Sequence, residues 1–142
     1  MRRASRKPTG SIELSVPGRI LQNALSYSSL KEITESRGLA KLGDALLGLL
    51  NVVGIEAGYL RDGSRVTNEM LRRVSTRTGL RVELRKRMGK RDLGNAVEAL
   101  VAYWFVRGDL SWPRVLEELK NGAELEEALV KQIQLVKGDA VS

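Results

Sequence analysis

Apolar residues recur along most of this chain at the three- and four-residue spacing of amphipathic helices, and no convincing pair of strands appears. The segments for which this spacing predicts a helix are 17–28, 38–58, 68–78, 80–88, 91–107, 111–120 and 123–136. Start signals support several of these boundaries, because Pro17 and Pro113 suit a first helical turn and Thr67 or Asn68 suits an N-cap. The pattern therefore predicts an all-α fold of about six to seven helices with no significant sheet.

The length of 142 residues fits one domain. We expect a basic flexible arm at residues 1–10, a helical domain at 11–120, and an acidic C-terminal helix at 121–142 that packs on the same domain. The basic start does not continue into an apolar run, so it does not predict a signal peptide. The apolar stretch at 42–55 is shorter than the roughly 20 residues that span a bilayer, so we expect a cytoplasmic protein with no membrane partner.

Two long apolar segments each contain a single charged residue, and in both it is a carboxylate. Asp44 is the only charge in 42–55, and Glu98 is the only charge in 93–106. Burying a carboxylate among apolar side chains is costly unless a cation, hydrogen-bond donors or a proton compensates. Two such sites in one chain therefore suggest a shared partner, with both carboxylates presented to one cleft.

The small and polar residues around each carboxylate form a stripe at helical spacing, on which another backbone could approach closely. The stripe on the earlier helix consists of Ala40, Asp44, Gly48 and Asn51. The stripe on the later helix consists of Gly94, Asn95, Glu98 and Ala102. If the two stripes face each other, Asp44 and Glu98 come within reach of one ion.

The residue types in the chain limit the chemistry of such a site. With no cysteine and no histidine, disulfides, thiolate and imidazole metal ligands and a histidine general base are all excluded. Oxygen ligands select hard ions, so the pair predicts a Mg²⁺ site that Mn²⁺ can also occupy. Such an ion can activate water and neutralise charge on a phosphoryl group, which fits phosphodiester hydrolysis. The alternative is that each carboxylate caps a helix or pairs with Arg or Lys in the core.

The net charge of +7 is distributed unevenly. Residues 1–108 hold 20 lysines and arginines against 10 acids, whereas residues 109–142 hold 4 against 7. The densest basic run directly precedes the second carboxylate helix, where it would guide a phosphate backbone towards Glu98. We define the basic cluster, expected to contact such a polyanion, as Arg72, Arg73, Arg85, Lys86, Arg87, Lys90 and Arg91. The alternative is a solvated face that only keeps the protein soluble.

The two carboxylate segments resemble the catalytic signatures of ribonuclease III. Residues 39–47, Leu-Ala-Lys-Leu-Gly-Asp-Ala-Leu-Leu, resemble the first signature, and residues 95–100, Asn-Ala-Val-Glu-Ala-Leu, resemble the second. Residues 24–29 and 70–73 resemble two further helix motifs of the family, so that the resemblance covers about 20–119. It implies a Mg²⁺-dependent endoribonuclease in which Asp44 and Glu98 bind the metal and catalyse. It also implies a homodimer that cuts both strands of double-stranded or structured RNA.

Two positions depart from the family pattern, which has Glu where this chain has Ala40 and Asp where it has Asn95. Asn95 can still serve as a metal ligand through its amide oxygen. The chain thus resembles the compact members of the family, mini ribonuclease III and short archaeal ribonuclease III-like proteins. We expect the catalytic domain itself to hold RNA, because the chain ends before the double-stranded RNA-binding domain of longer enzymes. With only six aromatic residues, it suits a duplex recognised by shape and phosphates.

Two other functions remain open from the sequence. One is a catalytically weakened or inactive family member that binds structured RNA, which the uncharged Ala40 and Asn95 would permit. The other is a helical protein-interaction domain whose acids are structural and whose basic face meets an acidic protein.

Overall fold

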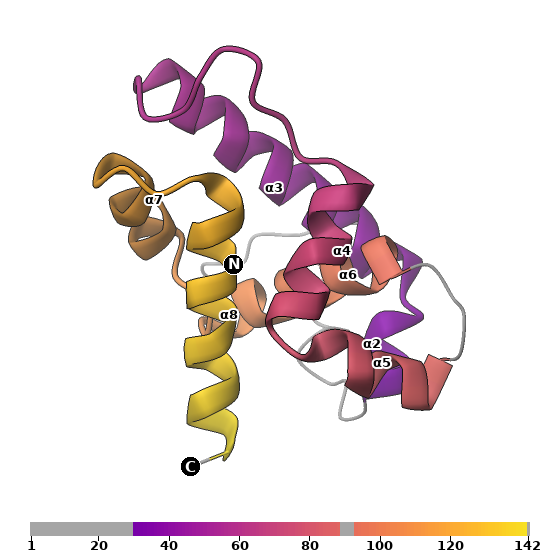
Figure 1. The fold of residues 1–142 in the computed structure, drawn as a ribbon. Coiled ribbons are helices and arrows are strands. Elements are labelled where there is room, and N and C mark those ends of the chain that lie inside the picture. The colour runs from indigo at the N-terminus through magenta and orange to yellow at the C-terminus, as the bar shows by residue number, and fades with distance from the viewer. Residues whose placement is uncertain (1–29, 89–92, 142) are drawn as a thin grey trace, which may run out of the picture.

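The computed structural model describes residues 30–88 and 93–141, and every regular element in these ranges is an α-helix (Figure 1). In chain order the helices are α2 (Leu30–Thr34), α3 (Arg37–Glu56), α4 (Asn68–Arg77), α5 (Leu80–Met88), α6 (Leu93–Arg107), α7 (Trp112–Lys120) and α8 (Leu125–Val141). With seven helices and no strand in the described ranges, the predicted all-α fold is confirmed. The helix predicted at 17–28 and the arm at 1–10 lie outside the described residues.

Helix α6 is the central helix of the domain, because it is apolar on nearly every side. It packs against four other helices, α2, α3, α4 and α5. Its buried residues are Gly94, Ala96, Val97, Glu98, Ala99, Leu100, Val101, Ala102 and Tyr103. A helix that is hydrophobic all round must be covered all round, so Glu98 is carried into the interior with its helix.

Helix α3 lies along α6 with one buried and one exposed face. Its buried residues are Leu39, Gly43, Leu47, Leu50, Asn51 and Gly54. The predicted stripe of close approach was wrong, because a Cβ at Gly48 would meet nothing within 4 Å, whereas one at Gly43 would meet the backbone of α6. The physical reason is the rotation of α3: the row Leu39, Gly43 and Leu47, spaced by four residues, faces α6 and turns Leu49 towards solvent.

Hydroxyl side chains cap the beginnings of three helices. The Ser36 hydroxyl accepts a hydrogen bond from the Leu39 amide at 3.1 Å. Thr67 and Ser111 cap α4 and α7 in the same way. Such caps satisfy amide groups that have no partner within their own helix, each typically worth about 1 kcal/mol. The starts predicted near Thr67 and Ser111 are therefore confirmed.

The C-terminus of α3 comes at Glu56, two residues earlier than predicted. Gly58 adopts φ +83°, a left-handed conformation that favours glycine, and it reverses the chain. The amides of Tyr59 and Leu60 then donate to the Gly54 carbonyl at 2.8 and 3.0 Å. These bonds close the helix and direct the chain back towards α4.

Helix α2 was not predicted from the sequence. Its five residues are too few to show a helical period. Tertiary packing stabilises it, because Ile33 is buried and α2 contacts α6. The buried Thr34 hydroxyl is satisfied locally, donating to the Leu30 carbonyl at 2.8 Å.

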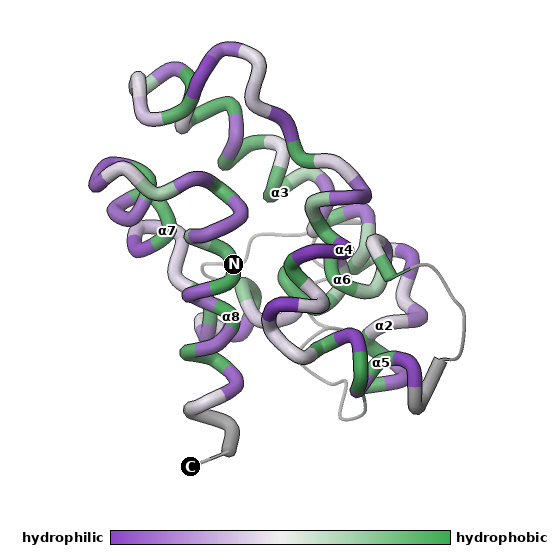
Figure 2. The backbone as a smooth tube through the Cα atoms, viewed as in Figure 1, coloured by the Kyte–Doolittle hydropathy of each residue, from purple (hydrophilic) through white to green (hydrophobic). Residues whose placement is uncertain are grey.

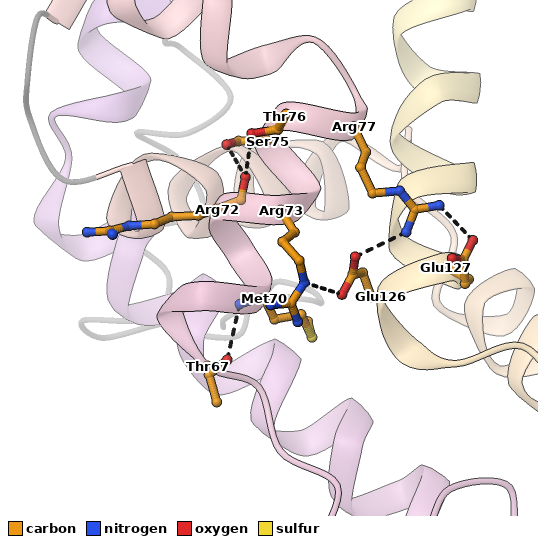
Figure 3. Close-up of polar contacts among 9 residues, drawn as sticks. All are labelled: Thr67, Met70, Arg72, Arg73, Ser75, Thr76, Arg77, Glu126 and Glu127. Carbon is orange, nitrogen blue, oxygen red and sulfur yellow. Dashed lines mark hydrogen bonds and ion pairs between the residues drawn. The ribbon is translucent and has the colours of Figure 1, made fainter.

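The acidic first turn of α8 is held on α4 by ion pairs, drawn in Figure 3. Arg73 pairs with Glu126 at 2.9 Å, and Arg77 pairs with Glu126 at 3.1 Å and with Glu127 at 2.9 Å. Hydrogen bonds to Glu127 and Glu126 raise the pKa of Arg77, and the same bond to Arg77 lowers the pKa of Glu127. The acids near the C-terminus thus pair with arginines of the basic part of the chain.

The C-terminal end of α4 is also covered by α8. Gln134 donates to the Arg77 carbonyl at 3.3 Å, and the Lys137 ammonium donates to the Thr78 carbonyl. These donors satisfy carbonyls that the end of a helix leaves open, and a cation there is favourable to the helix dipole. Figure 2 shows hydrophilic and hydrophobic residues alternating along α4 and α8, the pattern of helices with one face on a core.

By length and composition alone, α3 could cross a membrane, and no other helix in the described ranges passes that test. Core helices of soluble proteins pass the same test. In this structure α3 packs along α6, and its helix is longer than the apolar stretch at 42–55 because polar residues extend it at both ends.

Candidate active site

An open cavity of about 450 Å³ lies where α3, α6 and the start of α4 meet. The residues that line it are Arg37, Ala40, Lys41, Asp44, Asn68, Asn95 and Glu98. All three residues predicted as metal ligands, Asp44, Asn95 and Glu98, are therefore brought to one cavity from two helices. The two positions that depart from the signatures, Ala40 and Asn95, line it as well.

Helical periodicity places these side chains on common faces. On α3, Arg37, Lys41 and Asp44 follow one another at spacings of four and three residues, which is one face of a helix. On α6, Asn95 and Glu98 are three residues apart and share a face in the same way. Two rows of polar side chains thus meet across the contact between α3 and α6.

The contact between Gly43 and Glu98 sets the separation of these rows. A Cβ built on Gly43 would lie 1.9 Å from the Glu98 carbonyl oxygen and 2.5 Å from its carbonyl carbon, so only glycine fits there. Because Asp44 follows Gly43 directly, its backbone is held beside that of Glu98. The glycine of the first signature is explained by close packing of two backbones.

The two carboxylates differ in exposure. Glu98 is buried, with 8% of its surface exposed. Asp44, by contrast, is exposed. The apolar neighbours of Asp44 in sequence lie on other faces of α3, whereas Asp44 itself faces the open cavity. Its carboxylate therefore keeps access to water and to ions from solution.

The lining residues supply oxygen ligands that suit a hard divalent ion. Asp44 and Glu98 provide carboxylate oxygens, and the side chains of Asn95 and Asn68 provide amide oxygens. No group of three or more Asp, Glu, His or Cys that could hold a metal occurs among the described residues. With two carboxylates, the site fits an ion such as Mg²⁺ that is held by few protein ligands and keeps several waters.

Of the basic cluster, the side chains that the structure describes are those of Arg72, Arg73 and Arg85, and none of these three lines the cavity. Arg72 and Arg85 are exposed, and neither makes an ion pair within the described ranges. Arg73 is paired with Glu126, and Figure 3 shows Arg72 directed away from that pair. Lys86 and Arg87 belong to α5. Lys90 and Arg91 lie outside the described residues.

Three lining residues were missed by sequence reasoning: Arg37, Lys41 and Asn68. Arg37 and Lys41 could have been found, because they precede Asp44 by seven and three residues on one helix face. Asn68 had no such signal. It reaches the cavity because α4 packs on α6, a contact between segments distant in sequence.

Fold and cavity together define an all-helical domain in which carboxylates from two helices meet at one cavity. The family model described as Ribonuclease III matches residues 37–138, which include both carboxylate helices and most of α8, so the chain belongs to the ribonuclease III family. No curated protein and no solved structure matches the chain.

Proposed function

We propose that this protein is an endoribonuclease that hydrolyses phosphodiester bonds in double-stranded or structured RNA with the help of Mg²⁺, for which Mn²⁺ can substitute. The observation that carries the proposal is that Asp44 and Glu98 line one cavity, next to the close contact between Gly43 and the Glu98 backbone. Family membership over residues 37–138 supports the same reaction class.

Asp44 and Glu98 would hold the ion. The amide side chains of Asn95 and Asn68 would complete its coordination shell or orient the waters bound to it. When bound, the ion supplies Lewis acidity and water of lowered pKa. The buried Glu98 is fixed by its helix and gives a rigid ligand, whereas the exposed Asp44 lies on the solvent side, from which RNA must approach. The arginines Arg72 and Arg85 are free of ion pairs in the described ranges and are available for RNA phosphates.

Cleavage of a labelled RNA duplex tests this function. Wild-type protein with Mg²⁺ is expected to cut the duplex, whereas Asp44→Asn and Glu98→Gln lose about 100-fold or more in rate, because each removes a charged ligand. Asp62→Asn is the matched control, since Asp62 is an exposed acid outside the cavity. Equal cutting by all four proteins would remove Asp44 and Glu98 from the mechanism.

A second candidate function is binding of structured RNA with weak or no cleavage. The observation in its favour is that Ala40 and Asn95, where the signatures carry acids, both line the cavity, so two negative charges are missing there. Salt-sensitive duplex binding without cutting, at any Mg²⁺ or Mn²⁺ concentration, would favour this function. The third hypothesis, a helical protein-interaction domain, gains no support from the cavity or the family match.

We also propose that the protein is a homodimer that pairs through the exposed apolar face of α3. The residues of this face are Ala45, Gly48, Leu49 and Val52, all exposed. Leu49 and Val52 keep 54% and 53% of their surface accessible, which is unusual for large apolar residues on a core helix. A second copy is the occupant that the resemblance to ribonuclease III implies, and pairing here would bring the two cavities onto one assembly.

A further inference from the structure

The cavity contains two cations that the metal site itself does not use. Arg37 and Lys41 line it together with Asp44 and Glu98. Both cations are exposed, and neither makes an ion pair within the described ranges. Lys41 precedes Asp44 by three residues, a spacing at which opposite charges can pair on a helix, yet no ion pair joins them. The Lys41 ammonium is therefore available to a third group.

The balance of charge identifies that group. Among the described residues that line the cavity, two carboxylates and two cations carry no net charge, and a divalent ion held by the carboxylates would bring their total to +2. Two unit negative charges restore neutrality, and two successive phosphodiester groups of a nucleic acid strand carry two. Lys is an effective phosphate ligand because its compact ammonium is a mobile point charge, and Arg binds phosphate through two parallel bonds.

We propose that Lys41, assisted by Arg37, binds the phosphate of the RNA strand next to the one that is cleaved. This inference rests on the proposed RNA substrate. Ala40 is a short neighbour on the same cavity wall, so no carboxylate at that position competes with the phosphate for the two cations. The two cations thus contribute to substrate binding in a site that has fewer acids than the family signatures.

Duplex binding without divalent ions, compared at two salt concentrations, tests the inference independently of cleavage. Lys41→Met is expected to weaken binding about fivefold to tenfold, and to reduce the slope of log affinity against log salt by about 1, since about one phosphate contact is lost. The matched control is Lys120→Met, because Lys120 is an exposed lysine outside the cavity and its loss changes the net charge equally. Lys41→Arg keeps the charge and is expected to retain most of the affinity.

Single-turnover cleavage gives the second readout. Lys41→Met should raise the RNA concentration for half-maximal rate and leave the concentration of Mg²⁺ required nearly unchanged, whereas Asp44→Asn should abolish cutting. If wild-type protein binds the duplex but does not cut it, the proposed reaction fails while the binding comparison still decides the role of Lys41. Equal weakening by Lys41→Met and Lys120→Met would overturn the inference, and so would full affinity of Lys41→Met.

Discussion

Gly43 and Glu98 lie in direct backbone contact, closely enough that a Cβ on Gly43 would fall 1.9 Å from the Glu98 carbonyl oxygen. This contact fixes the distance between α3 and α6, and with it the relative position of Asp44 and Glu98. The glycine is therefore a structural requirement of the site, although it supplies no functional group.

Gly43→Ala should force the two helices apart. Overpacking of this kind typically lowers the free energy of unfolding by about 1–3 kcal/mol. A shift of about 1 Å in a reacting group can lower the cleavage rate by about 100-fold. Urea unfolding measures the first effect and duplex cleavage the second. Gly63→Ala is the control, because a Cβ at Gly63 would meet nothing within 4 Å and Gly63 lies outside both the cavity and the apolar face of α3. This variant should leave stability and cleavage nearly unchanged. Equal stability of the two variants would disprove the close contact.

Glu127→Gln should destabilise the protein in a pH-dependent way. The bond to Arg77 lowers the pKa of Glu127 below its ordinary value of 4.5, so its contribution to stability is present above that value and is lost as the pH falls through the lowered pKa. The variant should therefore unfold at lower urea than wild type at pH 6, and the difference should shrink at pH 3. A difference of the same size at both pH values would show that the ion pair contributes nothing.

Leu49→Glu should convert a dimer to a monomer, because it places a charge in the centre of the apolar face of α3. Sedimentation velocity across a range of protein concentrations measures the change. Leu135→Glu is the control, since Leu135 on α8 is a leucine of similar exposure, at 47%. If both variants and wild type sediment alike, the apolar face of α3 is not the subunit contact.

Asn95→Asp should strengthen metal binding. The new carboxylate lines the same cavity as Asp44 and Glu98, so it adds a charged ligand where the family signature has one. We expect the Mg²⁺ concentration for half-maximal cleavage to fall by about tenfold, because residues around a metal site typically change its metal affinity by about that factor. Val66→Ile, a conservative change outside the cavity, should leave the Mg²⁺ requirement unaltered. An unchanged Mg²⁺ requirement in Asn95→Asp would place Asn95 outside the metal shell.

The sequence predicted the helices well because most of them carry their own signals. Spacing of apolar residues and the caps at Thr67 and Ser111 depend only on neighbours within one turn. The short α2 has no such signal, since it is stabilised by packing on α6. Local pattern is therefore sufficient for long amphipathic helices and insufficient for short ones.

The candidate site was predicted in part. The lone acids Asp44 and Glu98 stand out against apolar neighbours, and they line one cavity. The exposure of Asp44 was not predictable, because sequence neighbours do not tell how α3 is rotated on α6. The close contact with Glu98, which only a glycine at position 43 allows, sets this rotation of α3. The same rotation brings Lys41 to the cavity.

The central claim is that Asp44 and Glu98 share one divalent ion, and a crystal soaked in Mn²⁺ tests it most directly. Anomalous difference density is expected in the cavity between the two carboxylates, and it should be absent from a crystal of the Asp44→Asn variant soaked in the same way. Manganese bound elsewhere in the molecule, with Asp44 and Glu98 contacting no ion, would contradict the claim.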